Sequence, residues 1–310
     1  MRDKPRLTRR AAFLGGMGAT LAACTPAPTS PPPAGGSPAP SPAAGNPAEP
    51  DLAAVEAGFS GRVGVYAVHT GTGASVQHRA DERFLLCSTH KVLAVSAVLR
   101  SSARQPGLLD RVIHYDRSQL LEYAPVTTRH VSDGMTVSAL CAAALTVSDN
   151  TAANLLVQLV GGPAAVTAFA RTLGDPVTRL DRTEPDLNVG APGDERDTTT
   201  PAAIAADLRA LTVGDALDPA GRDLLIGWLR TNTTGNQLIR AGVPAGWQVG
   251  DKSGSGAHGE TNDIAVVWPP GQAPLIIASY TAPGDPKSTA GPATVAKAAA
   301  IVCRTLVPAG

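Results

Sequence analysis

Residues 246–282 decide the fold of this chain. They contain three apolar stretches separated by Gly and Pro: GWQVGDKSGSG (246–256), DIAVVWPP (263–270) and APLIIASYTA (273–282). Short apolar runs bounded by such turn-forming residues are typical of β-strands. We therefore expect three strands near the C-terminus, followed by a helix in ATVAKAAAIVCRTLV (293–307).

The N-terminal part of the folded region predicts two more strands. In RVGVYAVHTGTGASVQHRA (62–80), apolar residues alternate with their neighbours until Thr-Gly-Thr-Gly turns the chain, as in a β-hairpin. Residues 87–173 are alanine-rich with helical spacing, residues 175–201 have the Pro, Gly and Asp content of a loop, and a helix is expected from Pro201. The economical fold is α/β (α+β): one antiparallel five-stranded sheet flanked by helices, with an all-α lobe inserted.

The first 23 residues have the features of an export signal. The segment MRDKPRLTRR contains five basic residues and one acid, and AAFLGGMGATLAA (11–23) is uncharged but too short to span a membrane. Leu21-Ala22-Ala23-Cys24 resembles a lipobox, in which Cys24 is lipidated, and residues 8–14 loosely resemble a twin-arginine export motif. We expect an exported protein that is lipid-anchored to the outer face of the cytoplasmic membrane.

Residues 24–50 are predicted to be the lipobox cysteine and a linker, because residues 25–50 hold ten of the 27 prolines and a single charge. Residues 51–310 would then be one folded unit with two interwoven lobes. The α/β lobe would comprise about 51–79 and 231–310, and the all-α lobe about 80–230.

The composition excludes several classes of protein. Lysine and arginine number 26, as do aspartate and glutamate, so the formal net charge is zero, which argues against a nucleic-acid partner. Four cysteines in 310 residues do not make a disulfide scaffold. The six histidines show neither H-x-H nor H-E-x-x-H spacing, so we expect no metal and no cofactor.

Three short motifs suggest nucleophilic catalysis. Ser88 and Lys91 are three residues apart at the start of an expected helix, so hydroxyl and amine can lie on one face. A serine needs a base to become a nucleophile, and a desolvated lysine can serve. Ser148-Asp149-Asn150 places three polar residues in an apolar context, where a helix cap is the alternative reading. The run from Lys252 to Gly256 places a cation and hydroxyls on a glycine-rich strand suited to a carboxylate.

Together the motifs carry a family resemblance. S-x-x-K, S-D-N and K-T-G in this order mark class A β-lactamases and penicillin-binding proteins, and here Ser253 replaces the threonine of the third motif. Residues 179–200, RLDRTEPDLNVGAPGDERDTTT, resemble the Ω-loop of class A serine β-lactamases. SQLLEYAPV (118–126), SDGMTV (132–137) and TGNQLIRAGVPAGW (234–247) extend the similarity over residues 51–310. The chain is identified as a member of this class.

The resemblance implies hydrolysis of the β-lactam amide of penicillins and cephalosporins through a serine acyl-enzyme, which confers antibiotic resistance. Ser88 would be the nucleophile and Glu184 the base that activates water for deacylation. Lys91 would help to deprotonate Ser88, although Glu184 is an alternative acylation base. Ser148 would pass a proton to the leaving lactam nitrogen.

The other implied roles are binding and structural. Asn188 would hold the deacylating water with Glu184, since the two are four residues apart. Asn150 would bind the substrate's side-chain amide, and the backbone N–H groups of Ser88 and Ser255 would form an oxyanion hole. The ring carboxylate would lie on the K-S-G-S segment, made up of Lys252, Ser253, Gly254 and Ser255. Tyr123 would line the entrance, while Arg182 and Asp197 would close the loop and Asp149 would order its surroundings.

Several positions depart from the family pattern. Thr261 stands where many relatives have a carboxylate-binding arginine, and neither Leu238 nor Gly291 supplies a basic replacement. His90 is expected to be a packing variant. Certain carbapenem-hydrolysing relatives have a disulfide between the position of Cys87 and a second cysteine, and Gly256 occupies that second position here. Cys141 aligns with another family disulfide position, but its usual partner position is occupied by Val95. We therefore expect no disulfide and place Cys303 in the core.

Two other functions remain open at this level. A peptidoglycan transpeptidase or carboxypeptidase shares the first three motifs but gives no reason for Glu184 and Asn188. A non-catalytic tethered binder on the same fold predicts a damaged set of catalytic residues. The expected partners are β-lactams, with membrane contact only through Cys24, and the protein is expected to be a monomer.

Overall fold

The computed structural model describes residues 46–308. The predicted export signal (1–23), the lipidation site Cys24 and the linker up to residue 45 lie outside the described residues. The described residues form one compact unit. Within residues 46–308, no single helix is long and apolar enough to span a membrane. One bent pair of helices, Asn150–Val160 and Pro163–Thr172, reaches that length and apolar character only when the two are taken together.

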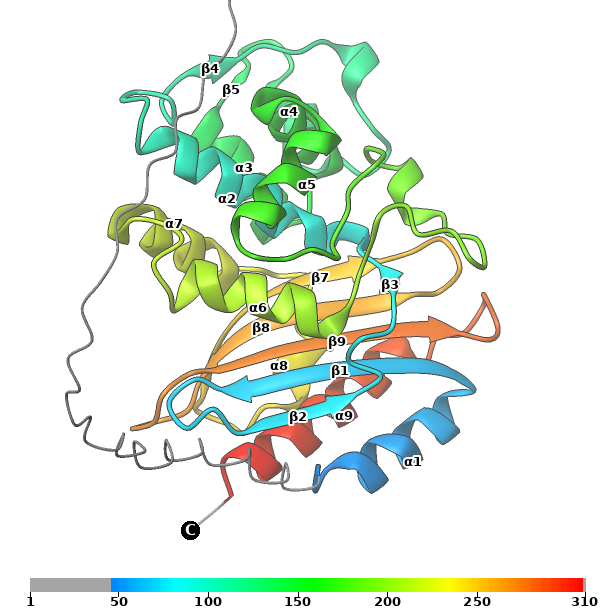
Figure 1. The fold of residues 1–310 in the computed structure, drawn as a ribbon. Helices are drawn as coiled ribbons and strands as arrows, with labels where there is room; N and C mark the ends of the chain where they lie inside the picture. The colour runs from blue at the N-terminus through cyan, green and yellow to red at the C-terminus, as the bar shows by residue number, and fades with distance from the viewer. Residues whose placement is uncertain (1–45, 309–310) are drawn as a thin grey trace, which may run out of the picture. The chain divides into compact units, whose positions relative to one another are not determined.

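A five-stranded antiparallel sheet forms the centre of the fold (Figure 1), as predicted. Its order is β2 (Ser75–His78), β1 (Gly61–His69), β9 (Leu275–Pro283), β8 (Thr261–Trp268) and β7 (Gln248–Ser255). Strands from the N-terminal and C-terminal parts of the described residues therefore meet at the centre of the sheet, where β1 pairs with β9. The predicted N-terminal hairpin is confirmed by the antiparallel pairing of β1 with β2.

Both faces of the sheet are buried, and the strands alternate between two apolar clusters. In β8, Ile264 and Val266 pack into one cluster while Ala265 and Val267 pack into the other. Successive side chains of a strand point to opposite faces, so this alternation follows from backbone geometry. It explains the continuous apolar runs in the sequence, because a sheet covered on both sides favours apolar residues on both of its faces.

Helices α1 (Glu49–Phe59) and α9 (Gly291–Leu306) cover one face of the sheet (Figure 1). Helix α1 begins at Glu49, two residues before the predicted domain start at residue 51. Pro50 lies in the first helical turn, where a missing N–H is tolerated, and acidic residues there interact favourably with the helix dipole. The last residues of the predicted linker therefore belong to a helix.

The opposite face of the sheet is covered by α6 (Pro201–Thr212), while α7 (Pro219–Arg230) packs against β7. Both helices lie within residues 80–230, the range predicted for the all-α lobe. They contact the sheet because each presents apolar residues to it at helical spacing: Ile204, Leu208 and Leu211 from α6, and Leu225 and Leu229 from α7.

Four helices form the remainder of the helical part: α2 (His90–Ser102), α3 (Val137–Thr146), α4 (Asn150–Val160) and α5 (Pro163–Thr172). Helix α2 is buried from His90 to Leu99 and packs against each of the other three. The segment between α2 and α3 is less helical than predicted. The remaining short elements are β3 (Phe84–Leu85), β4 (Val112–Ile113), β5 (Met135–Thr136), β6 (Thr198–Thr199), α8 (Ile239–Gly242) and several 3-10 turns.

Candidate active site

A cavity of about 680 Å³ lies where the helical part meets β7. Its lining brings together residues that the sequence places far apart, namely Ser88, Tyr123, Ser148, Asn150, Asn188, Ser253, Gly254 and Ser255. Three further predicted residues, Lys91, Glu184 and Lys252, are buried and contact these lining residues from below. The separate motifs therefore form one site.

Ser88 lies in a 3-10 turn, Cys87–Thr89, that leads directly into α2. Its hydroxyl donates a hydrogen bond to Oε1 of Glu184 at 3.1 Å. Strand β7 runs so close to this turn that a Cβ at Gly254 would lie 3.2 Å from the backbone nitrogen of Ser88. Glycine at that position therefore lets the strand and Ser88 approach each other.

Lys91 is fully buried and is held by four oxygen atoms. Its Nζ donates to the carbonyl of Ser148 at 2.8 Å, to Oγ of Ser148 at 3.1 Å and to Oδ1 of Asn150 at 2.6 Å. It also forms an ion pair with Oε1 of Glu184 at 3.0 Å. Burial lowers the pKa of Lys91, and the nearby Glu184 carboxylate opposes that change.

The predicted contact between Ser88 and Lys91 takes a different form. Within the described residues no hydrogen bond joins their side chains, and the Ser88 hydroxyl is directed to Glu184 instead. The three ammonium protons of Lys91 are already shared among Ser148, Asn150 and Glu184. Glu184 thus contacts both residues and links them.

Glu184 is held in place from both sides. The side chain of Asn154 on α4 accepts from the Glu184 backbone nitrogen at 2.9 Å and donates to its carbonyl at 2.8 Å. Nδ2 of Asn188 donates to Oε2 of the carboxylate. Burial alone would raise the pKa of Glu184, but the Lys91 charge and hydrogen bonds lower it to about 2. The carboxylate is therefore ionised at neutral pH.

Ser148 and Asp149 turn the chain from α3 into α4. Ser148 has a φ of +60°, an uncommon value for a residue with a side chain. Asp149 caps α4 by accepting from the backbone nitrogen of Ala152, and it also accepts from the nitrogens of Val126 and Thr127. Asp149 is thus the helix cap of this motif, while its two neighbours, Ser148 and Asn150, contact Lys91.

Lys252 is the second buried lysine of the site. Its Nζ donates to Oγ of Ser148 at 3.1 Å and to the carbonyl of Ser253 at 2.7 Å. Burial, together with repulsion from the Lys91 charge, lowers the pKa of Lys252 to about 7. The Ser148 hydroxyl consequently lies between two ammonium groups, which favours release of its proton.

His90, at the start of α2, is packed in the interior. One ring nitrogen contacts the carbonyl of Cys87 at 2.8 Å, and Nε2 has no hydrogen-bond partner within the described residues. Burial lowers the pKa of His90 to about 4, so the ring is neutral at neutral pH. Cys87, Cys141 and Cys303 are all buried free thiols.

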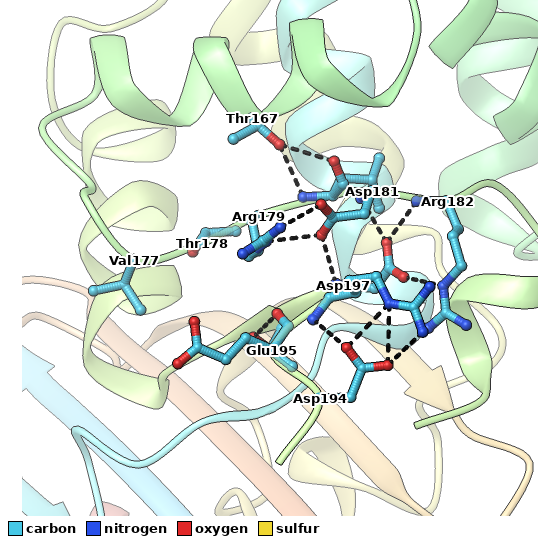
Figure 2. A network of polar contacts seen from close by, with 12 residues as sticks. Thr167, Val177, Thr178, Arg179, Asp181, Arg182, Asp194, Glu195 and Asp197 are labelled. Carbon is cyan, nitrogen blue, oxygen red and sulfur yellow. Dashed lines mark hydrogen bonds and ion pairs between the residues drawn. The ribbon is translucent and has the colours of Figure 1, made fainter. Parts of the chain in front are cut away.

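The loop that carries Glu184 is closed by a network of ion pairs (Figure 2). Nε of Arg182 contacts Oδ2 of Asp197 at 2.6 Å, and Oδ1 of Asp197 accepts from the backbone nitrogens of Asp181 and Arg182. Asp197 is fully buried, so its carboxylate ties the two ends of the loop together. Arg179 pairs with Asp181 beside them.

Sequence reasoning missed residues that position this site. Asn154 was not singled out, although it lies four residues after Asn150 on an apolar helix, so that both amides share a face. Thr234 was also missed; its hydroxyl contacts that of Ser253 at 2.6 Å. Within residues 46–308 no group of three or more His, Cys, Asp or Glu side chains could hold a metal ion.

Comparison with known proteins agrees with this geometry. The family model described as the β-lactamase enzyme family matches residues 47–306. β-Lactamase AST-1 of Nocardia asteroides is 53% identical over 259 residues, which is 84% of either chain, and β-lactamase FAR-1 of Nocardia farcinica is 52% identical over 83% of this chain and 82% of its own.

The fold is also similar to that of a relative of known structure. The class A β-lactamase from Mycobacterium abscessus superimposes with a TM-score of 0.82 at 56% identity, covering 83% of this chain and 98% of that one. The chain therefore belongs to the β-lactamase enzyme family. Within that family it is a class A β-lactamase, a hydrolase of β-lactams.

Proposed function

We propose that the protein hydrolyses penicillins and cephalosporins through an acyl-enzyme on Ser88. The observation that carries this assignment is the position of Glu184, whose two carboxylate oxygens contact the Ser88 hydroxyl and the Asn188 amide respectively. A water bound by Glu184 and Asn188 would thus lie beside the ester that Ser88 forms. A transpeptidase has no need of such a base.

Acylation begins when Oγ of Ser88 attacks the lactam carbonyl carbon. The Ser88 proton passes to Glu184, which accepts its hydrogen bond, or to a neutral Lys91, which contacts Glu184. The backbone N–H groups of Ser88 and Ser255 stabilise the oxyanion. The C–N bond then breaks, and the nitrogen takes the proton of Ser148, which Lys91 or Lys252 replaces.

Deacylation transfers the acyl group from Ser88 to water. The ionised Glu184 takes a proton from the bound water as the water oxygen attacks the ester carbonyl. The ester C–O bond then breaks, and Oγ of Ser88 takes the proton that Glu184 now holds, so that both groups return to their starting forms. The low pKa of Glu184 keeps it ready to act as a base at neutral pH.

Binding roles follow from the cavity. Asn150 would take the substrate's side-chain amide, and Lys252, Ser253 and Ser255 would hold the ring carboxylate. Tyr123, which is 51% exposed, lines the mouth. Arg182, Asp197 and Asp149 act structurally, because their contacts hold the segments that carry Glu184 and Asn150.

Turnover of benzylpenicillin and of a chromogenic cephalosporin tests the proposal. We expect multiple turnovers by the wild type and none by Ser88→Ala, the matched control. A penicilloyl adduct on Ser88 that forms but does not clear would support the transpeptidase alternative. Well-folded protein that neither turns over nor becomes labelled would support the non-catalytic binder.

We further propose that the protein is exported and works as a monomer anchored through lipidated Cys24, with the proline-rich segment as its tether. The support is the sequence of residues 1–50: a basic leader with a twin-arginine-like segment, a lipobox-like site and a linker. Mass spectrometry of the native N-terminus tests it. A diacylglyceryl-modified Cys24 is expected, and an unmodified Cys24 or cleavage elsewhere would refute the anchor.

A further inference from the structure

Part of the cavity wall is formed by residues to which no catalytic role is assigned. Beyond Ser253, its wall is made by Thr233, Thr234, Asn236, Gln237 and Leu238, and it is completed by Thr261 and Pro292. None of these seven wall residues is charged. The wall therefore offers hydrogen bonds and apolar contact but no charge.

The amides of this wall are free to bind a ligand. Asn236 and Gln237 are both exposed, and neither side chain makes a hydrogen bond within residues 46–308. The threonines beside them differ, because Thr233 donates to the carbonyl of Thr146 and Thr234 contacts Ser253 and Asn232. The two amides are thus the unengaged polar groups of the 233–237 segment.

The same segment is rigidly placed by two buried carboxylates. Asn232, just before it, donates to Oδ2 of Asp251 at 2.6 Å, and the backbone nitrogen of Ile239, just after it, donates to Oδ2 of Asp263 at 3.0 Å. A Cβ at Gly235 would lie 1.8 Å from Oδ2 of Asp251, so the backbone lies directly against that carboxylate. Such support holds the backbone from which the two amides project, which lowers the entropy lost when they bind a ligand.

The position of the wall defines which part of a substrate reaches it. With the side-chain amide at Asn150 and the ring carboxylate at Lys252 and Ser253, the ring carbon next to the carboxylate would lie nearest the 233–237 segment, because Thr234 of that segment contacts Ser253. In a cephalosporin that carbon bears the 3-substituent. This step rests on the proposed function and its substrate orientation.

We propose that Asn236 and Gln237 form a specificity subsite for neutral cephalosporin 3-substituents that carry a carbonyl oxygen. The side-chain amide N–H groups donate to that oxygen, and Leu238 and Pro292 contact the carbon atoms of the substituent. A 3-methyl group cannot accept these hydrogen bonds.

Two cephalosporins that share one 7-acyl group and differ only in 3-acetoxymethyl or 3-methyl test this subsite. The measured quantity is the ratio of their kcat/KM values in the wild type, N236A, Q237A and the double variant. Loss of a neutral hydrogen bond corresponds to about a 3- to 10-fold effect. We expect each single variant to reduce the acetoxymethyl-to-methyl ratio by about that factor, and the double variant to reduce it further. Comparing ratios cancels the intrinsic reactivity of each substrate.

Gln158→Ala is the matched control, because Gln158 is exposed on α4 and does not line the cavity; it should leave the ratio unchanged. The 3-methyl substrate reports whether each variant keeps an intact catalytic site. An unchanged ratio in the double variant, or an equal loss with both substrates, would overturn the subsite. Failure of the wild type to hydrolyse either compound would instead refute the proposed function.

Discussion

Two buried pairs of ionisable side chains in this protein behave in opposite ways. In the active site, Lys91 and Glu184 are fully buried and 3.0 Å apart, and Glu184 stays ionised. Behind the loop, Asp207 on α6 lies close to Asp175, and both are also buried. Neither oxygen of Asp207 has a hydrogen-bond partner within the described residues. Burial and the Asp175 charge raise the pKa of Asp207 to about 9.

The difference shows that burial alone does not decide whether a group is charged. A partner of opposite sign supports the charge of Glu184, whereas Asp207 holds a proton because it is buried without such a partner and lies beside the Asp175 charge. The first pair can do acid–base chemistry at neutral pH. The second mainly makes the folded state more sensitive to pH.

The largest expected effect comes from removing the base of the first pair. Glu184→Ala should still acylate but should deacylate about 10³-fold more slowly, because no group remains to activate the water. Intact-protein mass spectrometry after mixing with a penicillin should show an adduct on Ser88. Glu195→Ala is the matched control, since Glu195 is exposed in the same loop. Wild-type deacylation by the Glu184 variant would refute its assignment as base.

Removing the cation of the pair should destabilise the fold. Lys91→Met leaves Glu184 buried without its charge partner, and we expect the free energy of unfolding to fall by about 3 kcal/mol. Urea unfolding measures this. Adding Glu184→Gln in the Lys91→Met background should recover part of the loss, because the uncompensated charge is removed. Additive losses in the double variant would contradict the pairing.

The acidic pair predicts the opposite result. The pKa of Asp207 is higher in the folded state, at about 9, than in the unfolded state, at about 4. The stability that Asp207 contributes to the folded protein is therefore fully present below about pH 4, and it is lost as the pH rises towards about 9. Asp207→Asn should therefore stabilise the protein, on the order of 2 kcal/mol at pH 8 and less at pH 5.

Thermal unfolding at both pH values checks this prediction about Asp207. Asp223→Asn, at an exposed position on α7, is the control and should change little at either pH. If Asp207→Asn destabilised the protein equally at both pH values, the carboxyl would not be holding an extra proton.

The smallest effect concerns Lys252, the second cation beside the first pair. With a pKa of about 7, it carries its charge below that pH and loses it above, so kcat/KM for a penicillin should decline above about pH 7. Lys252→Arg keeps its charge throughout this range and should move the decline upward by about one pH unit or more. If the two proteins had the same pH profile, loss of the Lys252 charge would not be the cause of the decline in kcat/KM.

Much of this molecule follows from local sequence pattern. The apolar runs of 246–282 and the alternation of 62–80 predict five strands, because strand periodicity depends only on neighbouring residues. The motifs around Ser88, Ser148 and Lys252 can also be predicted from the sequence, because they belong to a helix start, a helix cap and a strand. The difference at Glu49 arises because Pro50 is tolerated in a first helical turn.

Tertiary structure alone decided how these pieces act together. The hydrogen bond from Ser88 to Glu184 joins residues 96 positions apart, and the shared contact of Lys91 and Lys252 with Ser148 depends on where α2 and β7 meet. The same holds for the clamp of Asn154 on Glu184, for the unpaired carboxyl of Asp207 and for the amides of Asn236 and Gln237. Whether a polar side chain is partnered, buried or left facing a cavity is set by distant segments. Composition and periodicity therefore predict the elements, while the charges and contacts that make the site arise only when the elements pack.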